Sequence, residues 1–270
     1  MLEARVSIEY NRQIGKDTWL MGFCSPDLAF HAMPGQFLMV HSGKATKDPL
    51  LRRPFSIHGI QDNDGLMILY KVVGKGTRLL SSLKKDNTIS VIGPLGNGFP
   101  LPGPHERILL VAGGMGIAPI FFLTQVLQEA RSLSPALILG FATSQNVVRV
   151  QELRDMSVDI SLSTEDGSAG HKGLVTDLMD DYLAHNAHEK PTVYACGPTP
   201  MLKAVARRAA DARIRCYVSL EGYMACGLQV CLGCAVKAAD GKAKAYHYVC
   251  QNGPVFLSEI IDWNGMQWLL

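Results

Sequence analysis

The sequence predicts a multidomain protein of β plus α/β class, with a small cysteine-rich domain at its C-terminal end. Short β-patterned segments broken by Gly, Pro, Asn and Asp fill the chain up to about Pro100. An apolar strand, a glycine turn and a helical pattern follow, and residues 216–270 hold five of the seven cysteines. Because 270 residues exceed one average domain, we expect an antiparallel β-barrel domain at residues 1–103, an α/β domain with a parallel sheet at 104–215, and a small domain at 216–270.

The composition excludes several classes of function. The chain is 47% hydrophobic and 19% charged with a formal net charge of +2, so no basic surface for nucleic acid is predicted. No apolar run approaches the length of a membrane span, and the alternating N-terminus lacks the apolar segment of a signal peptide. We therefore expect a cytoplasmic chain with neither nucleic-acid nor membrane partners, in a compartment where clustered cysteines favour metal binding.

The first hundred residues are expected to form the strands of an antiparallel barrel. The expected strands are Glu3–Tyr10, Thr18–Phe23, Gln36–His41, Leu66–Val73 and Thr88–Ile92. One short helix, Thr77–Leu83, is introduced by the turn Gly74-Lys-Gly76-Thr77. Free amides at such a helix start suit a diphosphate, with the Thr77 hydroxyl as a further donor. An ordinary glycine turn with a capping threonine is the alternative.

The middle of the chain predicts a nucleotide-binding α/β unit. The apolar run Arg107–Ala112 has the composition of a buried parallel strand, and the turn of Gly113, Gly114 and Gly116 leads into a helix expected over Ile120–Arg131. Glycines in that position let the backbone approach a diphosphate at the helix N-terminus. Further elements are expected as strands at Ala136–Phe141 and Thr192–Cys196 and a helix at Met201–Ala212.

Four cysteines near the C-terminus, Cys226, Cys231, Cys234 and Cys250, follow the spacing C-x4-C-x2-C plus one distant cysteine. This spacing is typical of a plant-type [2Fe-2S] site, which needs four thiolates. Structural zinc is an alternative, although zinc sites usually combine two C-x2-C pairs and only Cys231 and Cys234 make one. Two disulfides are a third possibility. Spacing and compartment favour the cluster.

The segment Arg53-Pro54-Phe55-Ser56 resembles the flavin motif of the ferredoxin-NADP reductase superfamily. A second segment of the chain is similar to the superfamily's diphosphate-binding motif and comprises Tyr70, Lys71, Val72, Gly76 and Thr77. The resemblance implies that Arg53 pairs with a phosphate of FAD, which suits a bidentate guanidinium, and that Ser56 bonds the redox-active edge of the flavin ring. A surface charge beside a proline turn is the alternative for Arg53.

The run Cys196-Gly197-Pro198, at the end of a predicted buried strand, resembles the nicotinamide-side motif of the same superfamily. By that resemblance Cys196 lies near the nicotinamide in a positional role, and the alternative is a small buried thiol. No catalytic side chain is assigned, because a flavin does the chemistry. The segment Phe141–Ser144 shows no arginine pair, which favours NAD over NADP, and Glu165 or Asp166 would accept ribose hydroxyls.

Taken whole, the chain resembles the electron-transfer subunits of class 1B dihydroorotate dehydrogenases, most clearly in the segments 219–234 and 249–256. The resemblance implies bound FAD, a [2Fe-2S] cluster and NAD as electron acceptor. It also implies a partner, the FMN-containing catalytic subunit, in a heterotetramer of two plus two that serves pyrimidine biosynthesis. Small subunits of NADH-dependent ferredoxin-NADP reductases and sulfide dehydrogenase-type flavoproteins share the layout, but the first of these are expected to have Asp where this chain has Cys226.

One residue departs from the family pattern. Gln229 stands where the family usually has glycine, between the first two cluster ligands. A side chain at this place either adopts a right-handed or extended backbone or accepts left-handed strain. The departure concerns the conformation of the loop and leaves the four cysteines intact.

Overall fold

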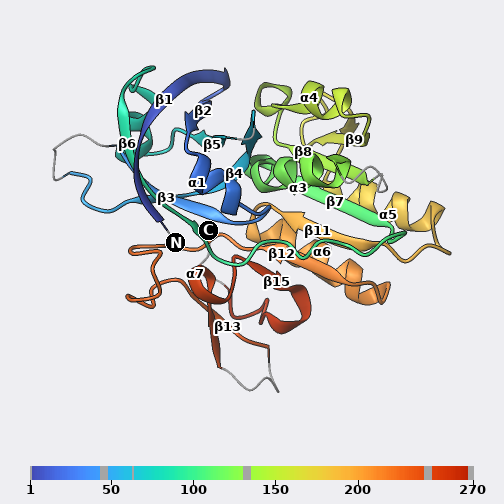
Figure 1. The fold of residues 1–270 in the computed structure, drawn as a ribbon. Coiled ribbons are helices and arrows are strands. Elements are labelled where there is room, and N and C mark those ends of the chain that lie inside the picture. The colour runs from blue at the N-terminus through green and yellow to red at the C-terminus, as the bar shows by residue number, and fades with distance from the viewer. Residues whose placement is uncertain (1, 43–47, 63, 130–134, 240–244, 267–270) are drawn as a thin grey trace.

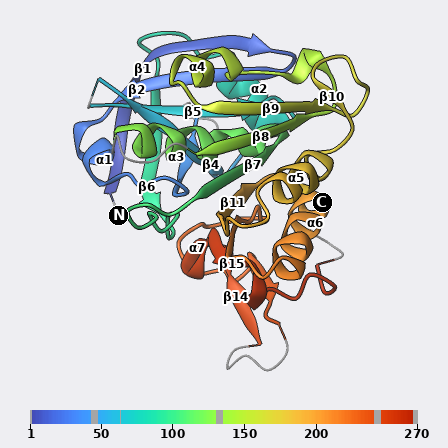
Figure 2. The same cartoon turned by 90° about the vertical axis from the view of Figure 1, so that its right-hand side faces the viewer.

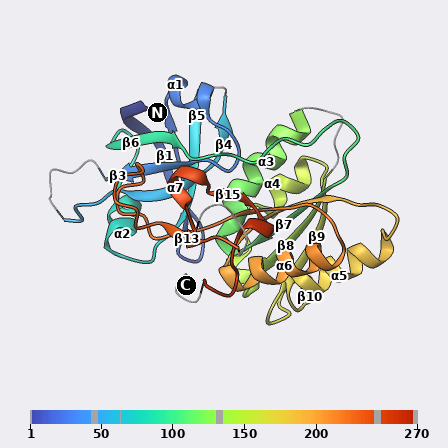
Figure 3. The same cartoon turned by 90° about the horizontal axis from the view of Figure 1, so that it is seen from below.

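The computed structural model describes residues 2–42, 48–62, 64–129, 135–239 and 245–266 (Figure 1). A β-barrel and an α/β sheet lie side by side, and the C-terminal segment runs along the boundary between them. Seen from below, α7 (Val249–Asn252) lies over this boundary (Figure 3). The predicted fold class is confirmed. No helix within the described residues is both long and apolar enough to cross a membrane.

The barrel is closed, with strand order β1-β2-β5-β4-β3-β6 and antiparallel pairing throughout. Its elements are β1 (Leu2–Gly15), β2 (Thr18–Cys24), α1 (Pro26–His31), β3 (Phe37–His41), β4 (Arg53–Gln61), β5 (Gly65–Lys71), α2 (Lys75–Ser81) and β6 (Thr88–Leu95). Alternate residues of β6 are buried, as a strand with one face on a core requires. Strand β4 was not among the expected strands; the sequence Arg52-Arg53-Pro54 reads locally as a turn.

The second part is a seven-stranded sheet of order β10-β9-β8-β7-β11-β12-β15. Its strands are β7 (Ile108–Gly113), β8 (Ala136–Phe141), β9 (Asp159–Thr164), β10 (His171–Lys172), β11 (Thr192–Cys196), β12 (Cys216–Ser219) and β15 (Val255–Leu257). All neighbours are parallel except β15, which runs antiparallel to β12. Two strands from beyond residue 215 thus complete the sheet that the middle of the chain begins.

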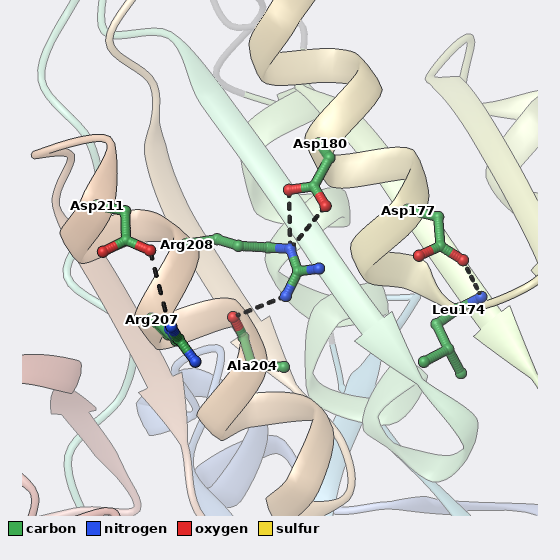
Figure 4. A network of polar contacts seen from close by, with 7 residues as sticks. All are labelled: Leu174, Asp177, Asp180, Ala204, Arg207, Arg208 and Asp211. Carbon is green, nitrogen blue, oxygen red and sulfur yellow. Dashed lines mark hydrogen bonds and ion pairs between the residues drawn. The ribbon is translucent and has the colours of Figure 1, made fainter.

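Helices cover both faces of this sheet. On one face, α3 (Ile117–Glu129) and α4 (Val150–Asp155) share a buried core with the strands, and on the other α5 (Val175–His185) and α6 (Thr199–Asp211) do so. Helix α5 is tied to α6 by Arg208, whose Nε donates to both oxygens of Asp180 at 2.8 and 2.9 Å (Figure 4). The helices expected at 120–131 and 201–212 correspond to α3 and α6. Residues 130 and 131 lie outside the described part of the chain.

The C-terminal segment consists of the hairpin β13 (Ala235–Lys237) and β14 (Tyr246–Tyr248), followed by α7. Figure 2 shows β14 toward the lower end of the molecule, with β15 and α7 above it. Barrel residues Phe37 and Met39 belong to the same buried cluster as Cys234 and Cys250. At the end of β6, the amide of Asn97 donates to the Gly253 carbonyl at 2.6 Å, and its side chain donates to the Asn252 carbonyl at 3.0 Å. The segment is therefore packed against the barrel.

A buried histidine joins the barrel to the sheet. The imidazole of His58, in β4, lies with Nδ1 at 3.0 Å from the Ala118 carbonyl of α3, and its Nε2 accepts from Arg149 Nε at 3.1 Å. Phe121 stacks on the imidazole at 4.4 Å between ring centroids, and the Arg149 guanidinium lies 4.4 Å from the Phe121 ring. Burial lowers the pKa of His58 to about 3, and the Arg149 charge adds to the effect. The neutral imidazole is thus the form that this interface holds.

Candidate functional site

The cysteine loop curls around the first of the four cysteines. Gly227, Gln229 and Leu232 have φ values of 67°, 65° and 59°, so the backbone turns left-handed at three places within the loop. Gln229 therefore takes the strained alternative, which a side chain adopts at some cost. The result is that the amides of Leu228 and Cys231 both point at Cys226 Sγ, at 3.3 and 3.4 Å.

The four cysteines lie as two pairs. The sulfurs of Cys234 and Cys250 are 3.3 Å apart and buried, and the Cys250 amide donates to Cys234 Sγ at 3.4 Å. Cys226 and Cys231 lie at the more exposed edge, where the Cys231 amide donates to Cys226 Sγ. All four are free thiols.

The chemistry of the four thiols suits an iron-sulfur cluster. Two pairs of thiolates with amides aimed at sulfur fit a [2Fe-2S] cluster, in which each iron takes two protein ligands.

The electrostatics of Cys226 and Cys250 differ. Burial raises the pKa of Cys226, but the amides of Cys231, Leu228 and Val230 outweigh it and bring the pKa down to about 7. For Cys250, burial and the neighbouring Cys234 raise the pKa to about 11. Cys226 is thus closer to the thiolate form that binds iron, and a bound metal charge would favour that form at Cys250.

Three cavities lie in a row beside this loop. The barrel cavity, of about 340 Å³, is lined by barrel residues and by the segment 219–224. The junction cavity, of about 350 Å³, shares Met115, Glu221 and Gly222 with it. The distal cavity, of about 450 Å³, shares Gly113 and Pro198 with the junction cavity. The three cavities therefore adjoin one another, in a series from the barrel to the carboxyl ends of the sheet strands.

The barrel cavity brings together most of the residues that the flavin motif singled out. Those that line it are Arg53, Pro54, Phe55, Ser56, Tyr70, Lys71 and Thr77. Gly76 lies behind Arg53, because a Cβ at position 76 would be 3.1 Å from Arg53 Nε. Val72 packs against the barrel core and does not reach the cavity. The arginine, the serine and an aromatic ring on one wall are side chains of the kinds that could hold a flavin.

Thr77 and Tyr70 have structural partners in this cavity. The Thr77 hydroxyl accepts from the amides of Val73 and Gly74 at 2.9 and 3.1 Å and lies 3.1 Å from the Gly74 carbonyl, to which it donates. It therefore caps α2, which agrees with the alternative interpretation of this segment as a glycine turn with a capping threonine. The Tyr70 hydroxyl donates to Asn11 Oδ1 at 2.9 Å, and burial raises the pKa of this phenol.

The opposite wall of the barrel cavity comes from the other two parts of the chain. It contains Met115, Ala118, Cys196, Ser219, Leu220, Glu221, Gly222, Met224 and Pro254. Sequence reasoning missed Glu221 and Met224, although both lie in the segment just before Cys226. Glu221 keeps an exposed surface, yet burial of its carboxyl raises its pKa. The sequence feature that could have indicated Glu221 is its position between a buried strand and the cysteine loop.

The nicotinamide-side motif lines the junction cavity through its backbone. Gly113, Gly116, Gly197 and Pro198 are at its wall, where the carboxyl ends of β7 and β11 lie side by side. A Cβ at position 116 would lie 2.0 Å from the Cys196 carbonyl oxygen, so only glycine fits there. Gly114 lines the distal cavity instead.

Cys196 lines the barrel cavity and is not activated. Its side chain is fully buried and lines the barrel cavity. Burial raises the pKa of the thiol, and the nearby Glu221 charge raises it further. A thiol held in this neutral form has no nucleophilic character, which agrees with a positional role.

A closed antiparallel barrel beside a mostly parallel α/β sheet, with adjoining cavities along both, is the architecture of ferredoxin-NADP reductase-like oxidoreductases. Solved structures with this fold include a ferredoxin NADP+ reductase from Neisseria gonorrhoeae, with a TM-score of 0.64, 16% identity and coverage of 78% of this chain and 91% of that one. A structure of an NADH-dependent reduced ferredoxin-NADP oxidoreductase has a TM-score of 0.86 and 31% identity, and the match covers 99% of this chain and 93% of that one.

The sequence comparisons show the particular family. Residues 221–262 match the iron-sulfur cluster binding domain of dihydroorotate dehydrogenase B, and residues 110–207 match the oxidoreductase NAD-binding domain. The electron transfer subunit of dihydroorotate dehydrogenase B (NAD(+)) from Desulforamulus reducens is 37% identical over 97% of this chain and 98% of its own length. The subunit from Geobacillus kaustophilus is 38% identical over 93% and 95%. The chain belongs to this family of electron transfer subunits.

Proposed function

We propose that this chain relays electrons from a partner dihydroorotate dehydrogenase, through a [2Fe-2S] cluster and FAD, to NAD. The observation that carries the proposal is the barrel cavity, which all three parts of the chain enclose. Met224, on its wall, lies two residues before the cluster ligand Cys226, and Glu221 and Gly222 open the same wall toward the junction cavity. A cofactor in the barrel cavity therefore lies between the cluster loop and the nicotinamide site.

Bound flavin supplies the exchange between two-electron chemistry at nicotinamide and one-electron chemistry at an iron-sulfur cluster. The protein residues bind and orient it. Arg53 supplies a cation for its phosphates, and Ser56 offers a hydroxyl to the ring edge. Phe55 and Tyr70, whose ring centroids are 5.6 Å apart, form an apolar side of the cavity. Residues from the C-terminal segment cover the opposite side and limit the access of water.

The cluster loop holds its metal site at the surface. Cys231 is exposed, and its neighbours Val230 and Leu232 keep 78% and 51% of their surfaces accessible. Apolar side chains around an exposed ligand favour docking of a protein partner at this edge. We assign the partner as the FMN-containing catalytic subunit, in a heterotetramer of two plus two. The cytoplasm, where thiols stay reduced, is the compartment we infer for it.

The second candidate is a small subunit of a ferredoxin-linked or sulfide dehydrogenase-type oxidoreductase. The similarity to the NADH-dependent reduced ferredoxin-NADP oxidoreductase, at 31% identity, supports it. Cys226 argues against the ferredoxin-linked subunit, because an aspartate is expected at the corresponding position of that subunit. Several curated relatives of 34–38% identity carry the dihydroorotate dehydrogenase name.

Coexpression with a candidate FMN-containing dihydroorotate dehydrogenase subunit separates the two. We expect a stable complex that contains FAD and about two irons per copy of this chain, and that reduces NAD when dihydroorotate is added. If the complex contains FAD and iron but does not reduce NAD when dihydroorotate is added, the chain functions as a ferredoxin-linked or sulfide dehydrogenase-type subunit. Absence of both cofactors would overturn the relay itself.

A further inference from the structure

Two of the four cysteines in the C-terminal segment are held together by the backbone around them. In the hairpin, Ala235 pairs with Tyr248, and beside this pair the Val249 amide donates to the Cys234 carbonyl at 3.0 Å. Cys250 follows Val249 in the first turn of α7. The main chain of the hairpin and of α7 thus fixes both cysteines, and their sulfurs are 3.3 Å apart.

A small movement would join this pair of sulfurs. The two sulfurs of a disulfide lie about 2 Å apart, so the hairpin keeps its pairing when the bond forms. The side chains of Cys234 and Cys250 are both 3% exposed, whereas Cys231 is exposed. Burial excludes a large thiol such as glutathione, while the neighbouring sulfur is within reach. Oxidation of either member of the pair is therefore expected to end in a bond between the two.

The pair lies behind the wall of the barrel and junction cavities. Gly222 lines both cavities, and a Cβ at this position would lie 3.8 Å from Cys234 Cβ. Cys234 is therefore next to a residue of the cavity wall that has no side chain. Hydrogen peroxide is a small oxidant that forms when oxygen reacts with a reduced flavin. Peroxide that forms in these cavities is thus produced beside the pair.

We propose that Cys234 and Cys250 form a reversible disulfide in chains that have lost their cluster, and that this bond preserves the two ligands. One sulfur attacks hydrogen peroxide to give a sulfenic acid and water, and the other sulfur then displaces the hydroxyl group as a second water. The two sulfurs lose two electrons, the peroxide gains them, and the two thiol protons end in the two waters. A sulfenic acid without a partner is oxidised further to sulfinic and sulfonic acids, which thiols do not reduce.

Mapping of disulfides by mass spectrometry tests the proposal on the full-length chain. The purified protein is freed of iron by a chelator, treated with hydrogen peroxide, alkylated without reduction and digested. We expect a cross-linked peptide that contains Cys234 and Cys250 as the main oxidised product, and dithiothreitol should return both thiols. Because buried neutral thiols are oxidised slowly, the bond should form over minutes to hours.

Two variants show whether the pair itself is responsible. The control Cys231→Ser removes an exposed thiol of the same loop and leaves the pair, so the cross-link should form as before. In Cys234→Ser, Cys250 has no partner and should accumulate sulfinic acid instead. Equal amounts of sulfinic acid at Cys250 in this variant and in the unmodified protein would contradict the protective role of the bond.

Uptake of iron and sulfide measures the consequence for the cluster. The cross-linked chain should take up at least about tenfold less iron than the reduced chain, because two of the four thiolates are consumed. Dithiothreitol should restore the uptake. This part of the inference rests on the ligand assignment of the proposed function, whereas the mapping of the disulfide does not.

The outcomes separate this inference from the proposed function. The disulfide is overturned if Cys234 and Cys250 stay free after peroxide treatment. It is also overturned if either is joined mainly to Cys226 or Cys231. Neither result affects the electron relay. A cross-linked chain that takes up iron as well as the reduced chain would overturn the preservation of ligands by the bond, and the ligand assignment of the proposed function with it.

Discussion

At the scale of single residues, local motifs were the most predictable part of the site. The cysteine spacing predicted four ligands of a [2Fe-2S] cluster, and the Arg-Pro-x-Ser motif predicted flavin contacts of Arg53 and Ser56, because chemistry of this kind depends on residue type and close spacing. Glu221 and Met224 escaped prediction, since their function depends on a wall formed by chain segments more than a hundred residues apart. Thr77, for which the sequence left a ligand contact and a capping role open, lines the barrel cavity and caps α2 with its hydroxyl.

Arg53 is expected to hold the flavin through its guanidinium. Arg53→Ala should weaken FAD binding by about ten- to a hundredfold, because a charge-assisted phosphate contact is lost. Fluorescence titration of the flavin-free protein with FAD measures this. The matched control is Arg52→Ala, since Arg52 pairs with Glu3 at 2.7 Å and not with the cavity. Equal losses of affinity in both variants would remove Arg53 from the flavin site.

His58 should make the stability of the chain depend on pH. Its folded pKa of about 3 lies below the unfolded value of about 6.5. The unfolded state therefore binds the extra proton, and the free energy of unfolding falls as the pH drops from about 6.5 toward 3, by about 1.4 kcal/mol per unit from this group.

Denaturant titrations between pH 7 and pH 5 measure that slope. His58→Gln should flatten it, at the cost of lower stability at pH 7, because the contacts with Ala118 and Arg149 are altered. His188→Gln removes an exposed imidazole and serves as the control. An unchanged slope in His58→Gln would show that the buried histidine does not control acid stability.

At the scale of secondary-structure elements, strands with simple alternation were predicted, but β4, which carries Arg53 and Ser56, was not. Strand β4 was missed because Arg53 and Pro54 resemble a turn, yet in a closed barrel the flanking strands impose an extended backbone on them. In the cluster loop, the sequence indicated that the glycines allow a tight turn around the cluster. Their contact with the barrel was not predicted.

Gly227 sets the distance between the cluster loop and the barrel. A Cβ at this position would lie 2.6 Å from Cγ and Sδ of Met39 in β3, and φ is 67°. Gly227→Ala should therefore lower iron content and destabilise the protein by about 1–3 kcal/mol. The matched control is Gly233→Ala, where the nearest atom, Cys231 Sγ, is 3.7 Å away.

Iron analysis and thermal unfolding of the three proteins measure the effect. Adding Met39→Ala to Gly227→Ala relieves the contact and should restore part of the iron content, although the left-handed backbone remains unfavourable for alanine. Comparable iron loss in Gly233→Ala would show that any alanine disturbs the loop, and that contact with the barrel has no special role.

At the scale of the whole molecule, the fold class was predictable but the interdependence of its parts was not. Domain boundaries follow from local composition, whereas β12 and β15 join the sheet from beyond residue 215. Asn97 and Gly253 connect the barrel to the C-terminal segment across more than 150 residues. Such contacts have no local signal. They make the barrel cavity a property of the complete chain.

Because Leu220, Met224 and Pro254 form a wall of the barrel cavity, a chain that ends at residue 215 should lose its flavin. We expect FAD affinity to fall by more than about tenfold, as the cavity opens to water and two strands of the sheet are lost. Gel filtration followed by absorbance at the flavin band measures the retained cofactor. Full retention of FAD by the shortened chain would show that the barrel binds flavin alone.

The central claim is that electrons pass from the cluster to NAD only through the flavin. The direct measurement is anaerobic rapid mixing of the stoichiometrically reduced chain with NAD, in which the cluster signal is followed by electron paramagnetic resonance. We predict that NAD reoxidises the cluster in the FAD-containing protein, and that the cluster stays reduced in flavin-depleted protein that retains its iron. Equally fast reoxidation without flavin would contradict the account, as would a cluster that stays reduced when FAD and NAD are both bound.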